Sequence, residues 1–491
     1  MTLFSFKVWL FAFLGAVTLA GFFSRSPIVP LVLYFGWLMV EDLVRKLWGN
    51  DMTIYFAKFI LMQPIILKTL KAWRKERDLL PRIVRAPLMV WIGVVLLNSF
   101  NPNLAHPLES LLGIHSDLFY LVIFLPAGYY LLRSFREVNI LFTLLCVFTI
   151  FPTIIGTMQQ TITPALWNER VLEGTELRPF LDRGIHVLRE SYFQVNSVFV
   201  DPGRYASYGA MMLLVGVGTG LLFSRSRVYS FVGWSAFGMS AINILFSGVR
   251  RTMVTAVATI LAFILLSAWT KRGVGRATRL GILLVKRLPL VAGVFALLYA
   301  VAAQPIEKGI RYFSSTLFGT ETMQSEVSSR LPGYVSQLSL IPKFGLLGQG
   351  TGSASLGKQY LQTRLGLSTT PYVSENGFTD KASAYGILGL TVWVWLLGAI
   401  LIALWDARKN APDPQRKAFV TLIFSWSAFF FTITQLWGSQ IIQDYLNQSF
   451  YWLLIGVALS CPQWASHQPL KMVQLRKAVD GNLRWSEGLG Q

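Results

Sequence analysis

The sequence predicts an all-α integral membrane protein, a polytopic bundle of about 12 to 13 transmembrane helices with one large extramembrane loop. The chain is 53% hydrophobic and only 14% charged, and its mean hydropathy is +0.51. Apolar runs recur along it, each close to the length that crosses a hydrocarbon core about 30 Å thick. One long polar segment, residues 303–384, interrupts this pattern.

Thirteen segments are candidates for the membrane spans. They cover residues 9–23, 28–40, 52–70, 87–100, 118–132, 138–158, 205–223, 229–246, 253–269, 280–303, 384–405, 418–437 and 450–460. The segment 52–70 is the weakest candidate, because Lys58, Pro64 and Lys68 interrupt it. If all thirteen cross, Met1 lies outside the cytoplasm. If Met1 lies inside, one of the first three does not cross.

The charge pattern predicts which loops face the cytoplasm. The net charge is +20, but the basic residues gather in short connections, which argues against nucleic-acid binding. Short loops rich in Lys and Arg are cytoplasmic by the positive-inside rule. These clusters are Lys71, Arg74, Lys75 and Arg77; Arg225 and Arg227; Lys271, Arg272, Arg276 and Arg279; and Arg408, Lys409, Arg416 and Lys417.

This orientation divides the chain into four parts. Residues 1–302 form transmembrane helices with a smaller non-cytoplasmic loop at 159–204, and residues 303–384 form the large loop on the same side. Residues 385–461 form the last transmembrane helices, and 462–491 form a cytoplasmic tail. Cys146 and Cys461 have no His or Cys at metal-ligand spacing, so neither a metal site nor a disulfide framework is indicated. No cofactor is expected.

Arginines on the non-cytoplasmic side break the positive-inside pattern and therefore need an explanation. Arg189 and Arg204 lie in the smaller loop, Arg250 in a short turn between two apolar spans, and Arg330 in the large loop. Guanidinium groups bind phosphate and diphosphate bidentately, best where water is partly excluded. The alternative is that they reach lipid headgroups or pair with nearby glutamates. Arg250 is the strongest candidate, because ionisable groups held at membrane depth usually serve a substrate or an ion.

Two further features of the large loop are candidates for the site. Glu375 lies just ahead of an apolar span, where burial could raise the pKa of its carboxyl and make it a base for a hydroxyl. Asn376 and Gly377 favour a turn, and Asp380 and Lys381 are candidate caps of the following helix. The glycines Gly348, Gly350 and Gly352 allow tight turns, with backbone N–H groups that could also face an anion.

Taken in order, these segments resemble the O-antigen ligase and O-antigen polymerase superfamily of bacterial surface glycans. The matching pieces are 196–206 (NSVFVDPGRYA), 247–250 (SGVR), Arg330, 341–353 (IPKFGLLGQGTGS), 375–377 (ENG) and 385–390 (YGILGL). The resemblance covers roughly residues 90 to 460. It departs at Glu375, where ligases of the family usually carry His, which favours a polymerase of O-antigen or exopolysaccharide over a ligase.

The resemblance implies a metal-independent glycosyltransferase of the bacterial inner membrane, with a GT-C-like helical bundle and a periplasmic active face. Its donor would be an oligosaccharide on undecaprenyl diphosphate, and its acceptor a glycan or a lipid. Arg250 with one or more of Arg204, Arg189 and Arg330 would hold the diphosphate, and Glu375 would act on the acceptor hydroxyl. Membrane lipids, and a chain-length regulator, are the remaining partners it suggests.

Two alternatives stay open at this stage. A ligase would transfer the glycan to a lipid acceptor from the same donor. A transporter or flippase of lipid-linked oligosaccharide would also have many spans and scattered arginines. It should, however, place its charges near mid-membrane and show broken helices, whereas the polar residues here gather in one loop on one face.

Overall fold

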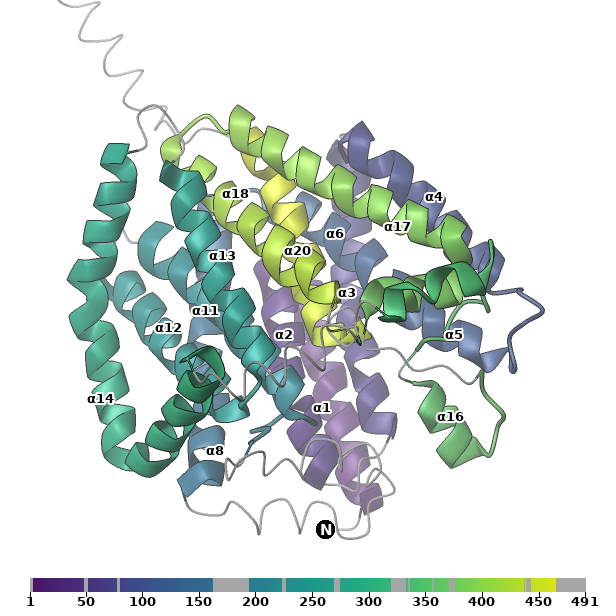
Figure 1. Cartoon of the computed structure of the whole chain (residues 1–491), viewed down its shortest axis with the longest axis horizontal. Coiled ribbons are helices and arrows are strands. Elements are labelled where there is room, and N and C mark those ends of the chain that lie inside the picture. Colours follow the sequence, from purple (N-terminus) through teal and green to yellow (C-terminus); the bar gives the residue numbers. More distant parts are fainter. Residues whose placement is uncertain are drawn as a thin grey trace, which may run out of the picture.

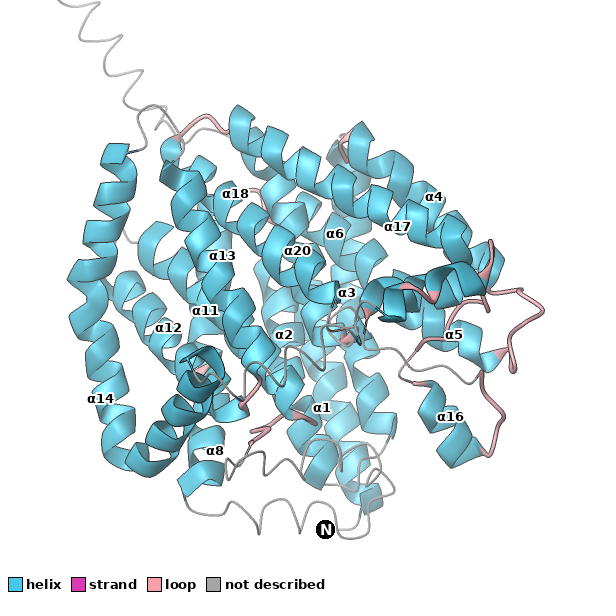
Figure 2. Cartoon of the chain, viewed as in Figure 1, coloured by secondary structure: helices cyan, strands magenta, loops and turns pink. Residues whose placement is uncertain are grey.

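The computed structural model describes residues 3–47, 52–76, 80–161, 194–222, 227–268, 274–318, 333, 336–355, 357–370, 376–436, 438 and 443–464. Over these residues the regular structure is entirely helical (Figure 2), which confirms the prediction of an all-α bundle. The helices pack side by side around a continuous apolar core, and most run along one common direction (Figure 1).

The N-terminal part of the chain forms helices as far as the smaller loop. They are α1 (Leu3–Phe23), α2 (Ile28–Leu47), α3 (Met52–Glu76), α4 (Arg82–Asn98), α5 (Leu108–Ile114), η1 (His115–Phe119), α6 (Tyr120–Leu131), α7 (Phe135–Phe148) and α8 (Ile150–Thr161). The π-helical segment η1 joins α5 and α6 into one span.

The rest of the chain forms a second series. It comprises α11 (Pro202–Val217), η2 (Gly218–Leu222), α12 (Arg227–Ser247), α13 (Arg250–Ala268), α14 (Val274–Phe318), η3 (Ile341–Phe344), α16 (Lys358–Leu365), α17 (Gly377–Asn410), α18 (Pro414–Trp426), η4 (Ser427–Thr432), η5 (Ile433–Leu436), α20 (Tyr445–Ser460) and η6 (Cys461–Gln463).

Nine helices in the described part of the chain are long and apolar enough to cross a membrane. They coincide with nine of the thirteen predicted segments, including α3, which the sequence marked as the weakest candidate. The other four predicted segments are also helical, as α1, α2, α4 and α20. They fall outside the nine because α4 and α20 have only 17 and 16 residues, the apolar part of α1 covers only Lys7–Phe23, and the C-terminal half of α2 is charged.

The centre of the bundle is the span formed by α11 and η2 (Pro202–Leu222), whose most apolar 18-residue window is 94% buried. Glycines bring other helices into backbone contact. A methyl group on Gly128 of α6 would lie 2.0 Å from the carbonyl oxygen of Leu453 in α20, and one on Gly456 would lie 2.1 Å from that of Leu125. Such close approach replaces the hydrophobic driving force that helices lack in lipid.

The two ends of the bundle differ. The end of α13, the start of α14 and the turn between α17 and α18 lie at one end of the bundle, where α20 also ends (top of Figure 1). Four basic residues flank the turn between α17 and α18: Arg408 and Lys409 in the last turn of α17, and Arg416 and Lys417 in the first turn of α18. The helices α11, α13 and α20 begin toward the other end. The assignment of the basic end to the cytoplasm stays a prediction.

Two helix breaks lie close to the predicted limits of the large loop, 303 and 384. The backbone of α14 leaves helical geometry at Ala302, and that of α17 does so at Gly386, where φ is +66°. Helical residues continue beyond both breaks, so the loop itself begins and ends with helix. The predicted loop boundaries therefore correspond to kinks within α14 and α17 and not to helix ends.

The polar loop is joined to the break in α17 by four backbone hydrogen bonds. Before the break, the carbonyl groups of Ser383 and Ala384 accept from the N–H groups of Gln349 and Gly350, at 2.7 and 2.9 Å. After it, Ile387 N and Leu388 N donate to the carbonyl groups of residues 345 and 346, at 3.0 and 3.3 Å. The loop thus replaces the hydrogen bonds that the helix loses, as an apolar setting requires.

Candidate functional site

Residues from three of the sequence motifs, at the starts of α11, α13 and α17, contact the stretch from the end of η5 to the start of α20. Of this stretch, Leu436 at the end of η5 and residues 438, 443 and 444 are described. Asn376 Nδ2 donates to the carbonyl of Leu436 at 2.9 Å. Arg251 Nη1 lies 3.4 Å from where a methyl group on Gly438 would be. Arg204 Nε lies 2.7 Å from Asp444 Oδ1. The starts of α11, α13 and α17 are therefore all held against this connection.

Arg204 stands at the start of α11 because the local sequence builds a helix N-terminus there. Asp201 is the N-cap and accepts from Arg204 N at 3.0 Å, and Pro202 follows at the first helical position. The guanidinium contacts two carboxylates, Asp42 through Nη1 at 2.6 Å and Asp444 through Nε at 2.7 Å. Its positive charge is therefore already matched within the protein.

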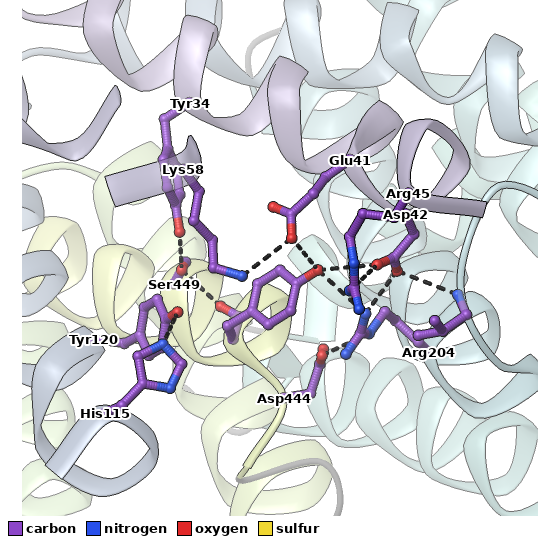
Figure 3. Close-up of polar contacts among 12 residues, drawn as sticks. Tyr34, Glu41, Asp42, Arg45, Lys58, His115, Tyr120, Arg204, Asp444 and Ser449 are labelled. Carbon is purple, nitrogen blue, oxygen red and sulfur yellow. Dashed lines mark hydrogen bonds and ion pairs between the residues drawn. The ribbon is translucent and has the colours of Figure 1, made fainter. Parts of the chain in front are cut away.

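Arg204 belongs to a larger buried group, here called the ionic cluster, that joins α2, α3, α11 and α20 (Figure 3). The ionic cluster consists of Glu41, Asp42, Arg45, Lys58, Arg204 and Asp444. Three carboxylates face three cations, so the cluster as a whole can be electrically neutral. Neutrality is what allows such groups to be buried, since an uncompensated charge in the interior is very costly.

Lys58 and Glu41 are the most deeply buried pair of the cluster. Both side chains are fully buried, and Lys58 Nζ lies 3.1 Å from Glu41 Oε1. The ammonium also lies between two aromatic faces, 3.2 Å from the ring centroid of Tyr55 and 3.4 Å from that of Tyr445. The Tyr445 hydroxyl donates toward Glu41 Oε1 at 3.1 Å. The Arg204 guanidinium carbon lies 4.6 Å from the centroid of the same Tyr445 ring. Tyr445 therefore contacts both the Lys58–Glu41 pair and Arg204.

The Arg250 turn lies beside the segment that leads into α11. Gly248 has φ +65°, which lets the chain reverse between α12 and α13. Gln194 Nε2 donates to the carbonyl of Gly248 at 2.9 Å, and Val195 N donates to that of Phe246 at 3.2 Å. These contacts bring the two arginine-bearing motifs of the sequence to the same place. Arg250 itself is half-buried at the first residue of α13.

The glycine run folds as a packed turn. Gly348, Gly350 and Gly352 have φ of +71°, +105° and +93°, and a methyl group on Gly352 would lie 1.8 Å from the carbonyl oxygen of Glu109. The N–H groups of Gln349 and Gly350 bond to α17, and that of Thr351 donates to the carbonyl of Asn98 at 3.1 Å. Three of the N–H groups that could have faced an anion are therefore already used.

A second buried ion pair, here called the Asp117 cluster, joins the π-helical segment η1 to α17. Lys381 Nζ lies 2.6 Å from Asp117 Oδ1, and the Tyr385 hydroxyl donates to Asp117 Oδ2 at 2.5 Å. Next to it, Gln443 Nε2 donates to Asp380 Oδ2 at 3.1 Å. Asp117, Asp380, Lys381 and Gln443 line a small polar cavity with room for about one water.

The structure changes the interpretation of residues 376–381. The N-cap of α17 is Asn376, whose side chain accepts from Phe378 N and Thr379 N at 2.9 and 3.1 Å. Asp380 and Lys381, predicted as possible caps, instead bond to other elements of the bundle. Of the predicted site residues, Glu375, Arg189 and Arg330 lie outside the described residues.

Sequence reasoning missed most of both clusters, although a signal was present. Lys58 lies within an apolar run and Asp117 directly precedes one, and ionisable residues at such places usually face the bundle interior. Lys58 was counted only as an interruption of its segment. The pairing partners Glu41 and Lys381 lie 17 and 264 residues away, so only the fold reveals that the charges are matched.

Within the described residues no group of three or more His, Cys, Asp and Glu could hold a metal ion. Comparison of the chain with protein-family models and with curated proteins finds no match.

Proposed function

We propose that this chain is a membrane glycosyltransferase that uses an oligosaccharide linked to undecaprenyl diphosphate, with polymerisation of repeat units as its reaction. Transfer of the glycan to a lipid acceptor, as a ligase, is the closest alternative. The proposal rests on one observation. The starts of α11 and α13, which carry Arg204 and Arg250, and the residue that follows Glu375 all meet at the connection between η5 and α20.

In this proposal Arg250 binds the diphosphate. It stands at the N-terminus of α13, where the helix dipole adds to the attraction for an anion, and it is half-buried. Arg189 and Arg330 remain candidates for the same role from the sequence. Arg204 takes a positioning role instead, because two carboxylates already surround its guanidinium and it ties α11 to α2 and α20.

Glu375 is proposed to accept the proton of the acceptor sugar hydroxyl. It directly precedes Asn376, which is fully buried and hydrogen-bonded to Leu436. The hydroxyl oxygen bonds to the anomeric carbon while the bond from that carbon to the phosphate oxygen breaks. Arg250 stabilises the negative charge that gathers on the departing undecaprenyl diphosphate. A single displacement of this kind inverts the anomeric carbon.

The test is mass spectrometry of lipid-linked glycans in cells that lack the gene and are complemented with variants. We expect Arg250→Ala and Glu375→Gln to abolish polymer and to accumulate single repeat units on the polyprenyl carrier. Arg311→Ala is the matched control, because that arginine is 83% exposed and its loss should leave polymer unchanged. Long chains left on the carrier would identify a ligase. Normal polymer from both variants would refute the assignment of the site.

A transporter of lipid-linked oligosaccharide is the second candidate, and two observations favour it. The ionic cluster lies inside the bundle, and α14 and α17 are broken at Ala302 and Gly386, as helices of transporters often are. Purified protein in liposomes separates the two functions. A glycosyltransferase should form a new glycosidic bond from donor and acceptor added on one side, whereas a transporter should move the donor across the bilayer without forming a new bond.

A further inference from the structure

The ionic cluster has an unsatisfied acceptor at its most buried point. Glu41 is 0% exposed, and its Oε1 accepts from Lys58 Nζ and from the Tyr445 hydroxyl, both at 3.1 Å. Among the residues that the structure describes, none donates to Glu41 Oε2. A buried carboxylate oxygen without a donor bears the full cost of its lost hydration, so this atom requires an explanation.

A second fully buried glutamate shows a satisfied carboxylate in the same chain. Glu109 Oε1 accepts from Thr370 N at 3.1 Å, and Glu109 Oε2 accepts from the Thr370 hydroxyl at 3.0 Å. Both oxygens of Glu109 therefore have a donor. Glu41 lacks one donor in an equally buried place.

The Tyr445 hydroxyl cannot supply both carboxylates that lie beside it. It lies 3.1 Å from Glu41 Oε1 and 3.3 Å from Asp42 Oδ1, but it carries a single proton. Arg204 Nη1 donates to the same hydroxyl at 3.2 Å. Only one of the two carboxylates can therefore accept from Tyr445 at a time. A proton bound to a carboxyl group would provide the donor that this part of the cluster lacks.

The surroundings of Glu41 suit a proton in two ways. A proton needs no cavity, and both Glu41 and Lys58 are fully buried. The Lys58 ammonium also has a second source of stabilisation, because it lies 3.2 Å from the ring centroid of Tyr55 and 3.4 Å from that of Tyr445. Desolvated cation–π contacts stabilise an ammonium without a counter-ion. Lys58 can therefore stay charged in its place when Glu41 becomes neutral.

A series of contacts joins Glu41 to the less buried edge of the cluster. The exposed fraction of the side chain is 0% for Glu41, 2% for Asp42, 9% for Asp444 and 15% for Arg204. Tyr445 lies between Glu41 and Asp42, and Asp42 contacts Arg204 at 2.6 Å. A hydroxyl group both donates and accepts, so it can pass a proton from one carboxyl group to the other.

We propose that Glu41 is a proton-binding site, which takes up one proton from the less buried edge of the cluster through Asp42 and Tyr445. The proton forms an O–H bond on the Glu41 carboxyl, and the ionic cluster gains one net positive charge. Lys58 then loses its counter-charge, so α3 is held less firmly against α2. Because Tyr445 and Arg204 stand at the starts of α20 and α11, proton uptake changes the contacts beside the candidate site, whichever reaction takes place there.

Several elements contribute charged or titratable groups around Glu41 (Figure 3). They are Tyr34, Asp42 and Arg45 of α2, Tyr55 and Lys58 of α3, His115 of η1, Tyr120 of α6, Arg204 of α11, and Asp444 and Tyr445 at the start of α20. His115 is the competing explanation for any effect of mild acid, because histidine ordinarily titrates in that range. Its Nε2 lies 2.7 Å from the Tyr120 hydroxyl.

The first test is the infrared difference spectrum of the purified protein between neutral and mildly acidic pH. The carbonyl band of protonated carboxyl groups should be larger by one group in the wild type than in Glu41→Gln. Glu109→Gln, the matched control at the other fully buried glutamate, should give the same band as the wild type. Equal bands from the wild type and Glu41→Gln would mean that Oε2 is satisfied in another way, such as by a buried water, and would overturn the inference.

The second test is hydrogen exchange, read as protection factors that are corrected for the intrinsic effect of pH. Protection of the α3 amides in the wild type should fall about tenfold from neutral to mildly acidic pH, because Lys58 loses its counter-charge. Glu41→Gln carries a neutral side chain of the same shape, so its α3 should show the lower protection at both pH values. The amides of α4, which contributes no residue to the ionic cluster, are the internal reference.

Two results would contradict the inference. Wild-type α3 protection that does not change with pH would overturn it without the use of any variant. A fall in protection that persists in Glu41→Gln and disappears in His115→Gln would show that the histidine is the group that titrates. The expected result is the reverse, with the pH dependence kept in His115→Gln and lost in Glu41→Gln.

Discussion

The pair formed by Lys58 and Glu41 gives the sharpest prediction about what holds the bundle together. The two side chains are fully buried and 3.1 Å apart. At the effective dielectric constant of about 20 that suits buried groups, two unit charges at this distance attract by about 5 kcal/mol. Removal of one partner leaves the other charge buried alone, which typically costs about 3–5 kcal/mol. Lys58→Met should therefore destabilise the protein by about that amount.

Glu41→Gln should cost less than Lys58→Met. The ammonium that remains still lies between the rings of Tyr55 and Tyr445, and a desolvated cation–π contact is worth about 2 kcal/mol. In the double variant neither charge remains. The double variant should therefore be destabilised by at least about 2 kcal/mol less than the two single variants added together, as expected for strongly coupled neighbours.

The measurement is the free energy of unfolding of the purified protein in mixed micelles, from titration with a denaturing detergent followed by tryptophan fluorescence. Lys409→Met is the matched control, because its ammonium is 59% exposed and 3.6 Å from Asp406. Exposed pairs of this kind contribute at most about 1 kcal/mol. A Lys58→Met protein as stable as the control, or a double variant whose loss equals the sum of the single losses, would refute the reasoning.

Three further predictions concern the contacts that fix the loop and the helices. Gly352→Ala should release the loop and speed its cleavage in limited proteolysis. Gly345→Ala, also at positive φ but with nothing within 4 Å, should do so much less. Asp117→Asn should lower stability by about 3–5 kcal/mol in the same unfolding assay, because it leaves a buried ammonium without its carboxylate. Gly128→Ala should reduce the yield of folded protein on size-exclusion chromatography, since its methyl group would lie 2.0 Å from a carbonyl of α20, whereas Gly93→Ala meets nothing within 4 Å and should not.

The helices were predictable from sequence because membrane spans depend on local composition. Each of the thirteen predicted apolar segments coincides with a helix. The number of helices that qualify as spans was less predictable, because it depends on where each helix begins and ends, and α4 and α20 are helical over only 17 and 16 residues. The sequence also did not show why Lys58 is tolerated. In isolation it argues against a span, but Glu41 neutralises it from α2 and allows α3 to pack inside the bundle.

The candidate site was predictable only in part, for a related reason. The Arg250 turn and the segment around Arg204 stand out in the sequence because arginine is unusual at such places. That they lie side by side depends on contacts such as that of Gln194 with Gly248, which composition does not reveal. The partners Asp42 and Asp444 are equally hidden, and they are what changes the interpretation of Arg204 from a phosphate ligand to a positioning residue.

Polar contacts, more than apolar ones, determine the geometry of the candidate site. Lipid is as apolar as a leucine side chain, so burial of apolar surface does little to choose one arrangement of helices over another. An ion pair or a backbone hydrogen bond in the same setting is specific, because each group has few alternatives. The ionic cluster orders α2, α3, α11 and α20, and the Asp117 cluster orders η1 and α17. In the proposed function, the two clusters fix the starts of α11 and α17, and the contact of Gln194 with Gly248 places the Arg250 turn beside the segment that leads into α11, so that Arg250 and Glu375 can act on one substrate. Loss of either cluster should then reduce transfer even where the helices still fold.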